Sequence, residues 1–165
     1  MSIVFFEDTS WKNFVPLSYT RSLFDLKIGS LTTFEHFNRE SAKFLTRQYL
    51  EKVTHQRHPD SDVNKFEYNN DDIFINSLFI PCKSFLKKLT VKKDFLLSLK
   101  GKILMGKLKK SNYEYLYESI VHDKVINSRK LSREIFDIKN LNKYGTFYSW
   151  PWDLITHLRD TLCDQ

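Results

Sequence analysis

The sequence predicts an α/β fold of three layers built around a mostly parallel sheet. Two apolar runs, Ile3–Phe6 and Asp72–Ile80, are expected to be strands. The first has no polar alternation, which is typical of a strand buried on both faces of a parallel sheet. The chain of 165 residues is about the size of one domain. We therefore predict a single domain over residues 1–165.

The first half of the chain is expected to add one helix and one further strand. Ser30 is the expected N-cap of a helix over Leu31–Asn38. Lys43–Leu50 is predicted to be a strand followed by a turn, with the start of a helix as the alternative. His55–Asn70 is polar and contains Pro59, so we expect a surface loop or a crossover there.

The second half gives a helix, a strand pair and a closing helix. A helix is predicted over Lys83–Leu89, and the two apolar runs within Phe95–Leu108 indicate a hairpin or a strand pair at the sheet margin. Tyr113–Ile126 mixes β-branched and aromatic residues, whereas Ser128–Phe136 has helical spacing. Pro151–Leu162 is predicted to be an amphipathic helix that closes the domain.

Positive charge is concentrated in one segment of a basic chain. The formal net charge is +6, which permits anionic partners such as nucleotides, sugar phosphates or nucleic acid. Between Lys83 and Lys110 there are ten lysines and one acid, Asp94. Lysines can bind nucleic-acid phosphates, but apolar residues alternate with these lysines at spacings that place the apolar side chains inward. We therefore interpret the segment as a solvated face and expect no nucleic-acid partner.

The sequence also indicates a compartment. No apolar run approaches the roughly 18 residues that a bilayer span requires, so no membrane partner is expected. The apolar run at the N-terminus is too short for a secretory signal. Cys82 and Cys163 lie far apart in the chain. A reduced, cytoplasmic location is the expectation.

Three segments carry a resemblance to a known family. Pro16–Phe37 matches the start and the end of a block of the type P-L-T-x-T-R-P-K-P-L-L-P-x-G-K-P-L-I-E-H. Ile73–Pro81 resembles a strand that ends in V-N-G-D, and Trp150–Leu154 resembles a P-W-D-L-L helix. Together they resemble a divergent group of sugar nucleotidyltransferases related to the N-terminal domain of bifunctional N-acetylglucosamine-1-phosphate uridyltransferase. The resemblance implies a Rossmann-like nucleotidyltransferase domain, reduced in size.

The same comparison implies that the phosphate loop and the metal site are degenerate. The glycine-rich loop A-G-G-x-G-T-R of the family falls on Glu7–Asn13, where no glycine remains. The catalytic lysine falls on Leu23, one metal-binding aspartate on Leu78 and the second near Phe147. Nucleotidyl transfer uses backbone amides around the phosphates, a cation and carboxylates that hold magnesium. No metal ligands are predicted, Mg²⁺ is expected only if the protein is active, and the catalytic residues are unknown.

Five residues are candidates for binding a nucleotide or sugar phosphate. Arg21 and Lys27 flank Asp25 and could clamp a phosphate, with Asp25 holding Arg21 ready. Alternatively, Asp25 pairs with Arg21 and only fixes the loop. Lys12 could supply a cation at the loop, and Asn76 keeps the asparagine of V-N-G-D.

Three functions remain open at this point. The first is a sugar-1-phosphate nucleotidyltransferase homologue that, if active, joins a nucleoside triphosphate to a sugar phosphate. The second is a non-catalytic binding or assembly module on the same scaffold, which includes a homo-oligomer. The third is a nucleic-acid-binding protein that uses the lysines of Lys83–Lys110. Whether the chain is an enzyme is left undecided by its sequence.

Overall fold

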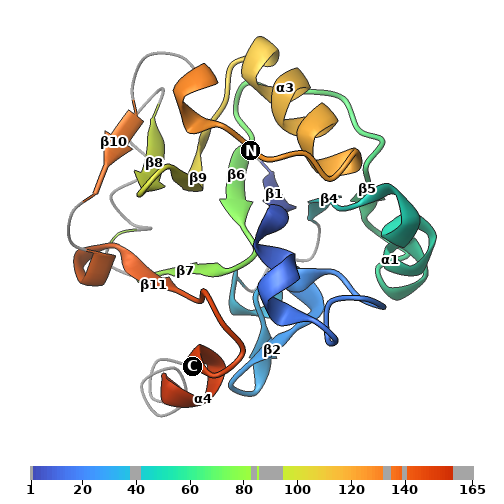
Figure 1. Cartoon of the computed structure of the whole chain (residues 1–165). Coiled ribbons are helices and arrows are strands. Elements are labelled where there is room, and N and C mark those ends of the chain that lie inside the picture. The colour runs from blue at the N-terminus through green and yellow to red at the C-terminus, as the bar shows by residue number, and fades with distance from the viewer. Residues whose placement is uncertain are drawn as a thin grey trace.

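The computed structural model describes residues 2–37, 42–82, 85, 95–131, 135–138 and 141–157. A seven-stranded sheet forms the middle layer in the order β10-β8-β9-β6-β1-β4-β5. Helix α3 lies on one side of this sheet, and the opposite side carries β2, β7 and β11 (Figure 1). The predicted α/β fold with a mostly parallel sheet is therefore confirmed.

The strands have the following bounds: β1 Ile3–Phe6, β2 Lys27–Ile28, β3 Leu31–Thr32, β4 Lys43–Leu45, β5 Asp62–Val63, β6 Ile73–Asn76, β7 Phe79–Pro81, β8 Leu96–Leu99, β9 Lys102–Lys107, β10 Ile135–Asp137 and β11 Gly145–Phe147. The α-helices are α1 Glu51–Arg57, α3 Lys110–Val121 and α4 Asp153–Thr156. The 3-10 helices are η1 Thr9–Phe14, η2 Leu23–Asp25, η3 Glu35–Phe37, η4 Gln48–Leu50, η5 Ser128–Lys130 and η6 Leu141–Lys143.

Strand β1 lies in the interior of the sheet and pairs in parallel with both β4 and β6. Strands β4 and β5 are also parallel, as are β8 and β10. Strand β9 is antiparallel to its two neighbours, β6 and β8. Two smaller antiparallel pairs, β2–β3 and β7–β11, lie outside the main sheet. The carboxyl ends of β1, β4 and β6 consequently lie at one edge.

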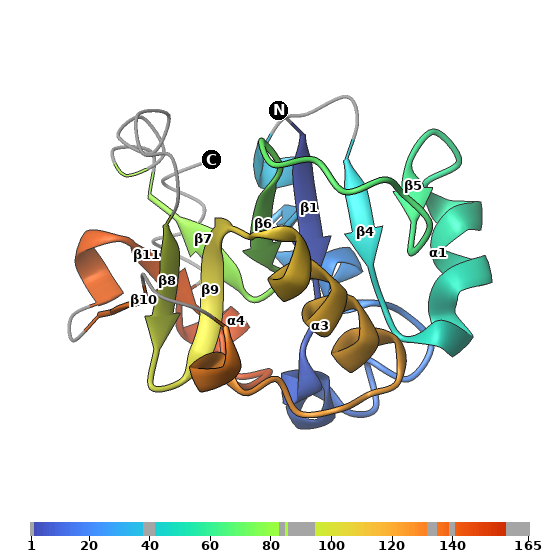
Figure 2. The same ribbon diagram turned by 90° about the horizontal axis from the view of Figure 1, so that it is seen from above.

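The two faces of the sheet bury separate apolar clusters. Along β1, Val4 and Phe6 face α3 and pack with its Leu116 and Ile120. Figure 2 shows α3 crossing the sheet on this side. Phe5 points the other way, into a second cluster that includes Phe14 of η1, Phe24 of η2 and Phe44 of β4. The alternation explains why β1 reads as a continuous apolar run, since both of its faces are covered.

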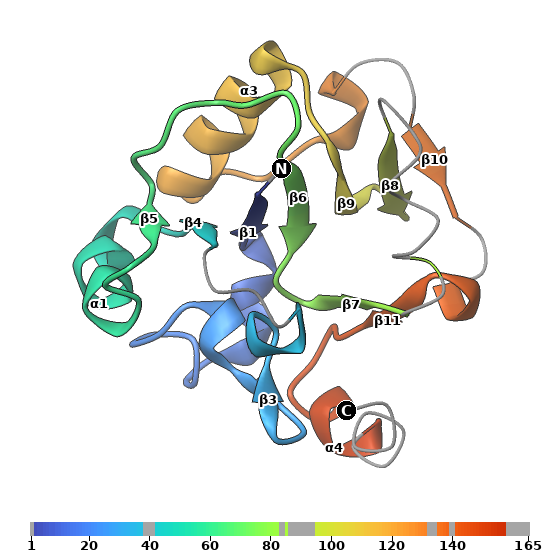
Figure 3. The same ribbon diagram turned by 180° about the vertical axis from the view of Figure 1, so that it is seen from behind.

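The first half of the chain differs from the prediction in two places. Strand β4 is confirmed, but the predicted helix over Leu31–Asn38 is wrong. The segment instead forms the end of a β2–β3 hairpin, with Gly29 at φ 75°, followed by the single turn η3. In Figure 3, β3 lies at the bottom of the view. The predicted loop over His55–Asn70 is wrong in part, because it contains the end of α1 and all of β5.

The second half of the chain also differs from the prediction. Asp72–Ile80 forms two strands, β6 and β7, because the chain turns at Ser77 and Leu78, where Ser77 Oγ donates to Phe6 O and Leu78 N donates to Asn76 Oδ1. The hairpin within Phe95–Leu108 is confirmed as β8 and β9. The helix predicted over Ser128–Phe136 is wrong, because η5 and β10 occupy its two ends.

Three further predicted segments agree with the structure only in part, or lie partly outside the described residues. Most of Tyr113–Ile126 is helical, because α3 runs to Val121. The predicted closing helix begins as α4, and its remainder lies outside the described residues, as does most of the helix predicted over Lys83–Leu89. None of the helices in the described part of the chain is long and apolar enough to cross a bilayer.

Candidate functional site

The carboxyl ends of β1, β4 and β6 form the edge at which open α/β sheets bind their ligands. Glu7 follows β1 directly, Thr46 and Arg47 follow β4, and Asn76 ends β6. All four side chains are buried. The residues that leave these strands therefore meet beneath the surface, and their bonds decide what the edge can do.

The Glu7 carboxylate is buried and accepts hydrogen bonds from three directions. One oxygen, Oε1, accepts from Thr46 Oγ1 at 2.5 Å, from Arg47 N at 3.1 Å and from Arg47 Nε at 3.0 Å. The other, Oε2, accepts from Leu23 N at 3.1 Å and from a terminal guanidinium nitrogen of Arg47 at 3.4 Å. Both oxygens are thus bonded within the protein, as a buried carboxylate requires.

The Arg47 guanidinium makes hydrogen bonds to several groups and stacks on one aromatic ring. Besides Glu7 it donates to the carbonyl oxygens of Ser18 at 2.8 Å and Arg21 at 3.4 Å. A further nitrogen donates to the Tyr49 hydroxyl, and the Trp11 ring lies 4.1 Å from the guanidinium carbon. This arrangement fixes the planar group in one orientation.

A chain of hydroxyls extends from Glu7 into the interior. Ser22 Oγ lies 2.7 Å from Thr46 Oγ1 and 3.0 Å from Thr54 Oγ1. The amide of Thr46 also donates to Asn64 Oδ1 at 2.9 Å. These bonds join β4, η2 and α1 around one buried carboxylate.

Asp8 and Asn76 form a second linked pair at this edge. Asp8 caps η1, because its Oδ1 accepts from Ser10 N at 2.8 Å. Its Oδ2 accepts from Asn76 Nδ2 at 3.0 Å. Asn76 Nδ2 also donates to the carbonyl of Ile103 at 3.1 Å, and Asn76 Oδ1 accepts from Leu78 N at 3.0 Å. The candidate binding residue Asn76 is therefore placed in the sheet and in the turn after β6.

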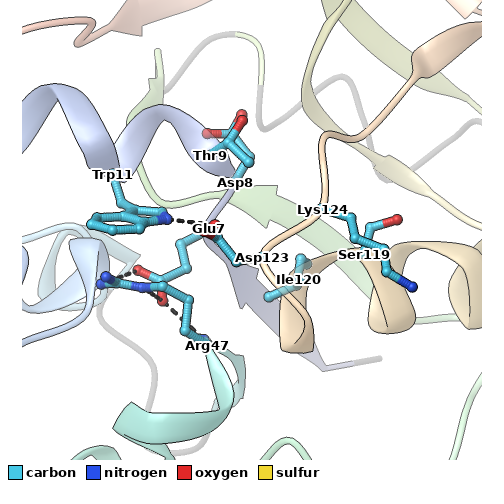
Figure 4. Close-up of a pocket in the computed structure, with 9 residues that line it drawn as sticks. All are labelled: Glu7, Asp8, Thr9, Trp11, Arg47, Ser119, Ile120, Asp123 and Lys124. Atoms are coloured by element: carbon cyan, nitrogen blue, oxygen red, sulfur yellow. Dashed lines mark hydrogen bonds and ion pairs between the residues drawn. The ribbon is translucent and has the colours of Figure 1, made fainter.

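The space above the ion pair is small. A cavity of about 10 Å³ lies between the end of β1, η1 and the end of α3, no larger than one water molecule needs. Figure 4 shows its lining residues: Glu7, Asp8, Thr9, Trp11, Arg47, Ser119, Ile120, Asp123 and Lys124. Next to it lies an open groove of about 490 Å³, lined by Arg47, Gln48, Tyr49, Val121, His122 and Asp123. Of these two spaces, the groove is the one with room for a ligand.

Asp123 separates the cavity from the groove and lines both. Its Oδ1 accepts from Trp11 Nε1 at 2.7 Å, and its Oδ2 lies 3.1 Å from Lys12 Nζ. Both partners belong to η1. The candidate cation Lys12 is thus paired with an aspartate at the end of α3. Burial, together with the charges of Arg47 and Glu7, perturbs the nearby Tyr49, and the net effect is a raised pKa of the phenol.

The other predicted residues occupy different surroundings. Arg21 and Lys27 are exposed. Asp25 pairs with Arg57 at 3.3 Å and with His58 Nε2 at 2.7 Å, so its carboxylate is bonded to α1 and the residue after it. The structure brings Arg21 to the buried ion pair through its carbonyl oxygen. That Arg21 and Lys27 bind a phosphate stays a prediction.

Sequence reasoning missed Arg47 and Asp123. A signal for Arg47 exists, since a charged residue comes shortly after the strand in both places: Glu7 directly follows β1, and Arg47 is the second residue after β4. Parallel strands bring such residues to the same edge. Asp123 follows a helix that was not predicted, so no local pattern pointed to it.

The carboxylates at this edge are bonded within the protein, and apolar residues stand at the positions that the resemblance assigns to metal-binding aspartates. Glu7 and Asp8 have both carboxylate oxygens bonded within the protein. Leu78 and Phe147, at the positions expected for metal-binding aspartates, are buried in the apolar core. Among the described residues, no group of three or more His, Cys, Asp and Glu side chains could hold a metal ion.

The fold defines an α/β protein with buried polar residues at the carboxyl ends of parallel strands, which is the edge where open α/β sheets commonly bind ligands. The family model described as "Sugar nucleotidyl transferase" matches residues 3–165. The chain belongs to this family, and the resemblance found in its sequence is confirmed.

One solved structure illustrates the likeness. It is the nucleoside-diphosphate-sugar pyrophosphorylase from Vibrio cholerae RC9, 12% identical in sequence, with a TM-score of 0.46. The match covers 95% of this chain and 99% of that chain. No curated protein matches the sequence.

Proposed function

We propose that this protein is a member of the sugar nucleotidyltransferase family that binds a nucleotide or sugar phosphate and does not carry out magnesium-dependent nucleotidyl transfer. The observation that carries the proposal is the buried pair of Glu7 and Arg47, at the first position of the predicted phosphate loop. An ion pair fills the place where such a loop would present backbone amides to an anion.

The chemistry of transfer supports this reading. The transferred phosphoryl group needs a cation and positioned donors to stabilise its developing charge. Glu7 adds negative charge at that place, and its guanidinium partner is bonded to Glu7 and to backbone carbonyls. Asp8 caps η1 and accepts from Asn76. A ligand at this edge would therefore meet carboxylates and a guanidinium that are already bonded within the protein.

The remaining features suit binding. The open groove of about 490 Å³ adjoins the edge, and the Tyr49 ring on its wall is 58% exposed. An exposed aromatic ring can stack on a base or on a sugar. Arg21 and Lys27 are exposed cations on the segment that follows η1, and Lys12 lies on η1 itself. These groups are the proposed contacts for the phosphate.

The test is thermal unfolding with uridine triphosphate, uridine monophosphate or glucose 1-phosphate, each with and without magnesium. A ligand at 100 times its dissociation constant adds about 2.7 kcal/mol of stability, which raises Tm by several degrees. We expect such a shift with at least one ligand, without a magnesium requirement. The shift should be lost in Arg21→Ala and kept in Arg57→Ala, which also removes one guanidinium.

Two outcomes would overturn the proposal. Magnesium-dependent release of pyrophosphate from a nucleoside triphosphate and a sugar phosphate would make the protein an active transferase. Unchanged midpoints with every ligand would remove the binding function and leave the assembly module, to be sought by measuring the molar mass in solution.

A further inference from the structure

Aspartate is not the expected residue at position 123, which directly follows the end of α3. It follows the helix with a φ of 51°, in the left-handed region. The amide of Asp123 donates to Ile120 O at 3.1 Å and that of Lys124 to Ser119 O at 2.7 Å. This pattern is a Schellman motif, in which the left-handed position is usually glycine. A carboxylate near a helix C-terminus is also unfavourable to the helix dipole.

The contacts of the Asp123 side chain account for its presence. Its two oxygens are bound by two donors on η1, Trp11 Nε1 at 2.7 Å and Lys12 Nζ at 3.1 Å. One is a neutral N–H and the other an ammonium, a pair of groups that also binds phosphate oxygens. In Figure 4 the Asp123 side chain points toward Trp11.

We propose that the Asp123 carboxylate occupies an anion site and that a phosphate group of the ligand displaces it. Asp123 then acts as an internal competitor that keeps the site closed until a phosphate takes its donors. The inference rests on the proposed function, because it concerns regulation of binding at the same edge. Its site comprises Trp11 Nε1 and Lys12 Nζ, reached through the groove beside Tyr49.

The place of Asp123 between the two spaces supports the displacement. It lines both the small cavity and the open groove, so a ligand in the groove can contact Asp123. The side chain of Asp123 is 37% exposed and that of Lys12 is 54% exposed. An ion pair this exposed is weak, so a phosphate can compete for it. The Glu7 charge lies nearby but is neutralised by Arg47.

Asp8 also lines the small cavity, and its carboxylate is a second negative charge near the proposed site. Its oxygens accept from Ser10 N and Asn76 Nδ2. Both bonds hold it at the start of η1 and at β6, whereas Asp123 bonds the side chains of Trp11 and Lys12. Asp8 is therefore expected to weaken phosphate binding equally in wild type and in Asp123 variants.

The experiment is isothermal titration of the full chain with inorganic phosphate and with uridine monophosphate. The test variant is Asp123→Gly, because glycine suits a φ of 51° and removes the carboxylate. We expect it to bind inorganic phosphate at least tenfold more tightly than wild type. The gain should vanish in the double variant with Lys12→Ala.

A matched control separates this effect from net charge. Asp71→Gly also removes one acid, which is 71% exposed and pairs with Lys107 at 3.4 Å. It should change phosphate affinity by less than about twofold. Asp123→Asn is the second test variant, since asparagine also adopts left-handed backbone and keeps an acceptor for Trp11. It should show a smaller gain than Asp123→Gly.

The outcomes distinguish this inference from the proposed function. If wild type binds uridine monophosphate and neither Asp123 variant binds phosphate more tightly, the competitor role is overturned and the binding function stands. If wild type binds nothing while Asp123→Gly binds phosphate, the anion site is supported and the proposed function of the wild-type chain fails. An equal gain in Asp71→Gly would overturn the inference, because net charge alone would explain it.

Discussion

Glu7 and Arg47 form an ion pair in which Arg47 Nε lies 3.0 Å from Glu7 Oε1, with 2% and 1% of the two side chains exposed. Placing both charges out of water is costly, and their attraction repays this only when the remaining hydrogen bonds are made. Here Leu23 N, Thr46 Oγ1 and the Ser18 carbonyl make them. The pair therefore connects the ends of β1 and β4 with the segment after η1.

Removing one partner of the Glu7–Arg47 ion pair should strongly destabilise the folded protein. Arg47→Met leaves the Glu7 carboxylate buried without its cation, so we expect the free energy of unfolding to fall by about 3–5 kcal/mol. Urea denaturation monitored by circular dichroism measures it. Arg57→Met is the control: Arg57 pairs with Asp25 but is 38% exposed, so its loss should cost less than about 1 kcal/mol. Equal losses in the two variants would contradict a buried, interdependent pair.

The hydroxyl of Thr46 should matter independently of its size. Thr46→Val keeps the shape but loses the donor to Glu7 at 2.5 Å and the contact with Ser22 at 2.7 Å. Leaving buried acceptors unpaired should lower the free energy of unfolding by about 1–3 kcal/mol. Thr156→Val, whose exposed hydroxyl donates to Trp152 O, should stay within about 0.5 kcal/mol. Equal denaturation midpoints for wild type and Thr46→Val would refute the network.

Apolar continuity made the buried strands predictable. Ile3–Phe6 and the hairpin within Phe95–Leu108 were predicted because both faces of the sheet are covered, which leaves little polar alternation. The helix α3 was not predicted, because its tyrosines and serines give only a weak apolar stripe. Two-residue elements such as β2 and β5 carry too few residues to show a period.

The buried bonds at this edge of the sheet were not predictable from the sequence. The strand pattern and the motif from Pro16 onward placed the edge, and counting the loop onto Glu7 and Asp8 showed that no glycine remains there. The partner of Glu7, Arg47, lies 40 residues away and just after β4, and no local spacing predicts such a pairing. A further long-range bond joins Trp11 to Asp123, 112 residues apart. Bonds of this kind depend on the packed fold.

Gly106 and Gly101 should respond differently to alanine. A Cβ on Gly106 would lie 2.4 Å from Phe95 O and 2.8 Å from Leu96 Cα, both backbone atoms of the neighbouring strand. Gly106→Ala must push β8 and β9 apart, and we expect a loss of about 3 kcal/mol. At Gly101 the nearest atom is 3.7 Å away, but φ is +81°, so Gly101→Ala should cost about 1 kcal/mol. Thermal denaturation ranks the two, and a larger loss for Gly101→Ala would contradict the contact between the strands.

Glu35 should make stability depend on pH on the acid side. The amide of Thr32 donates to Glu35 Oε2 at 2.7 Å, while Glu35 N donates to Thr32 Oγ1 at 3.3 Å, so Thr32 caps η3 in place of the predicted Ser30. The bond from the Thr32 amide lowers the pKa of Glu35 from its ordinary 4.5. A lowered pKa in the folded state stabilises the protein above the ordinary pKa, and this stability is lost as pH falls through the folded pKa.

Glu35→Gln removes that contribution, so wild type should exceed the variant in stability at pH 7, and the difference should shrink as the pH falls below about 4. Urea denaturation of both proteins across this range measures the difference directly, since titration of the other carboxylates cancels. Glu114→Gln, an exposed glutamate of α3, serves as the matched control and should show no comparable loss at pH 7. A difference between wild type and Glu35→Gln that stays constant with pH would mean that the charge of Glu35 contributes nothing to capping η3.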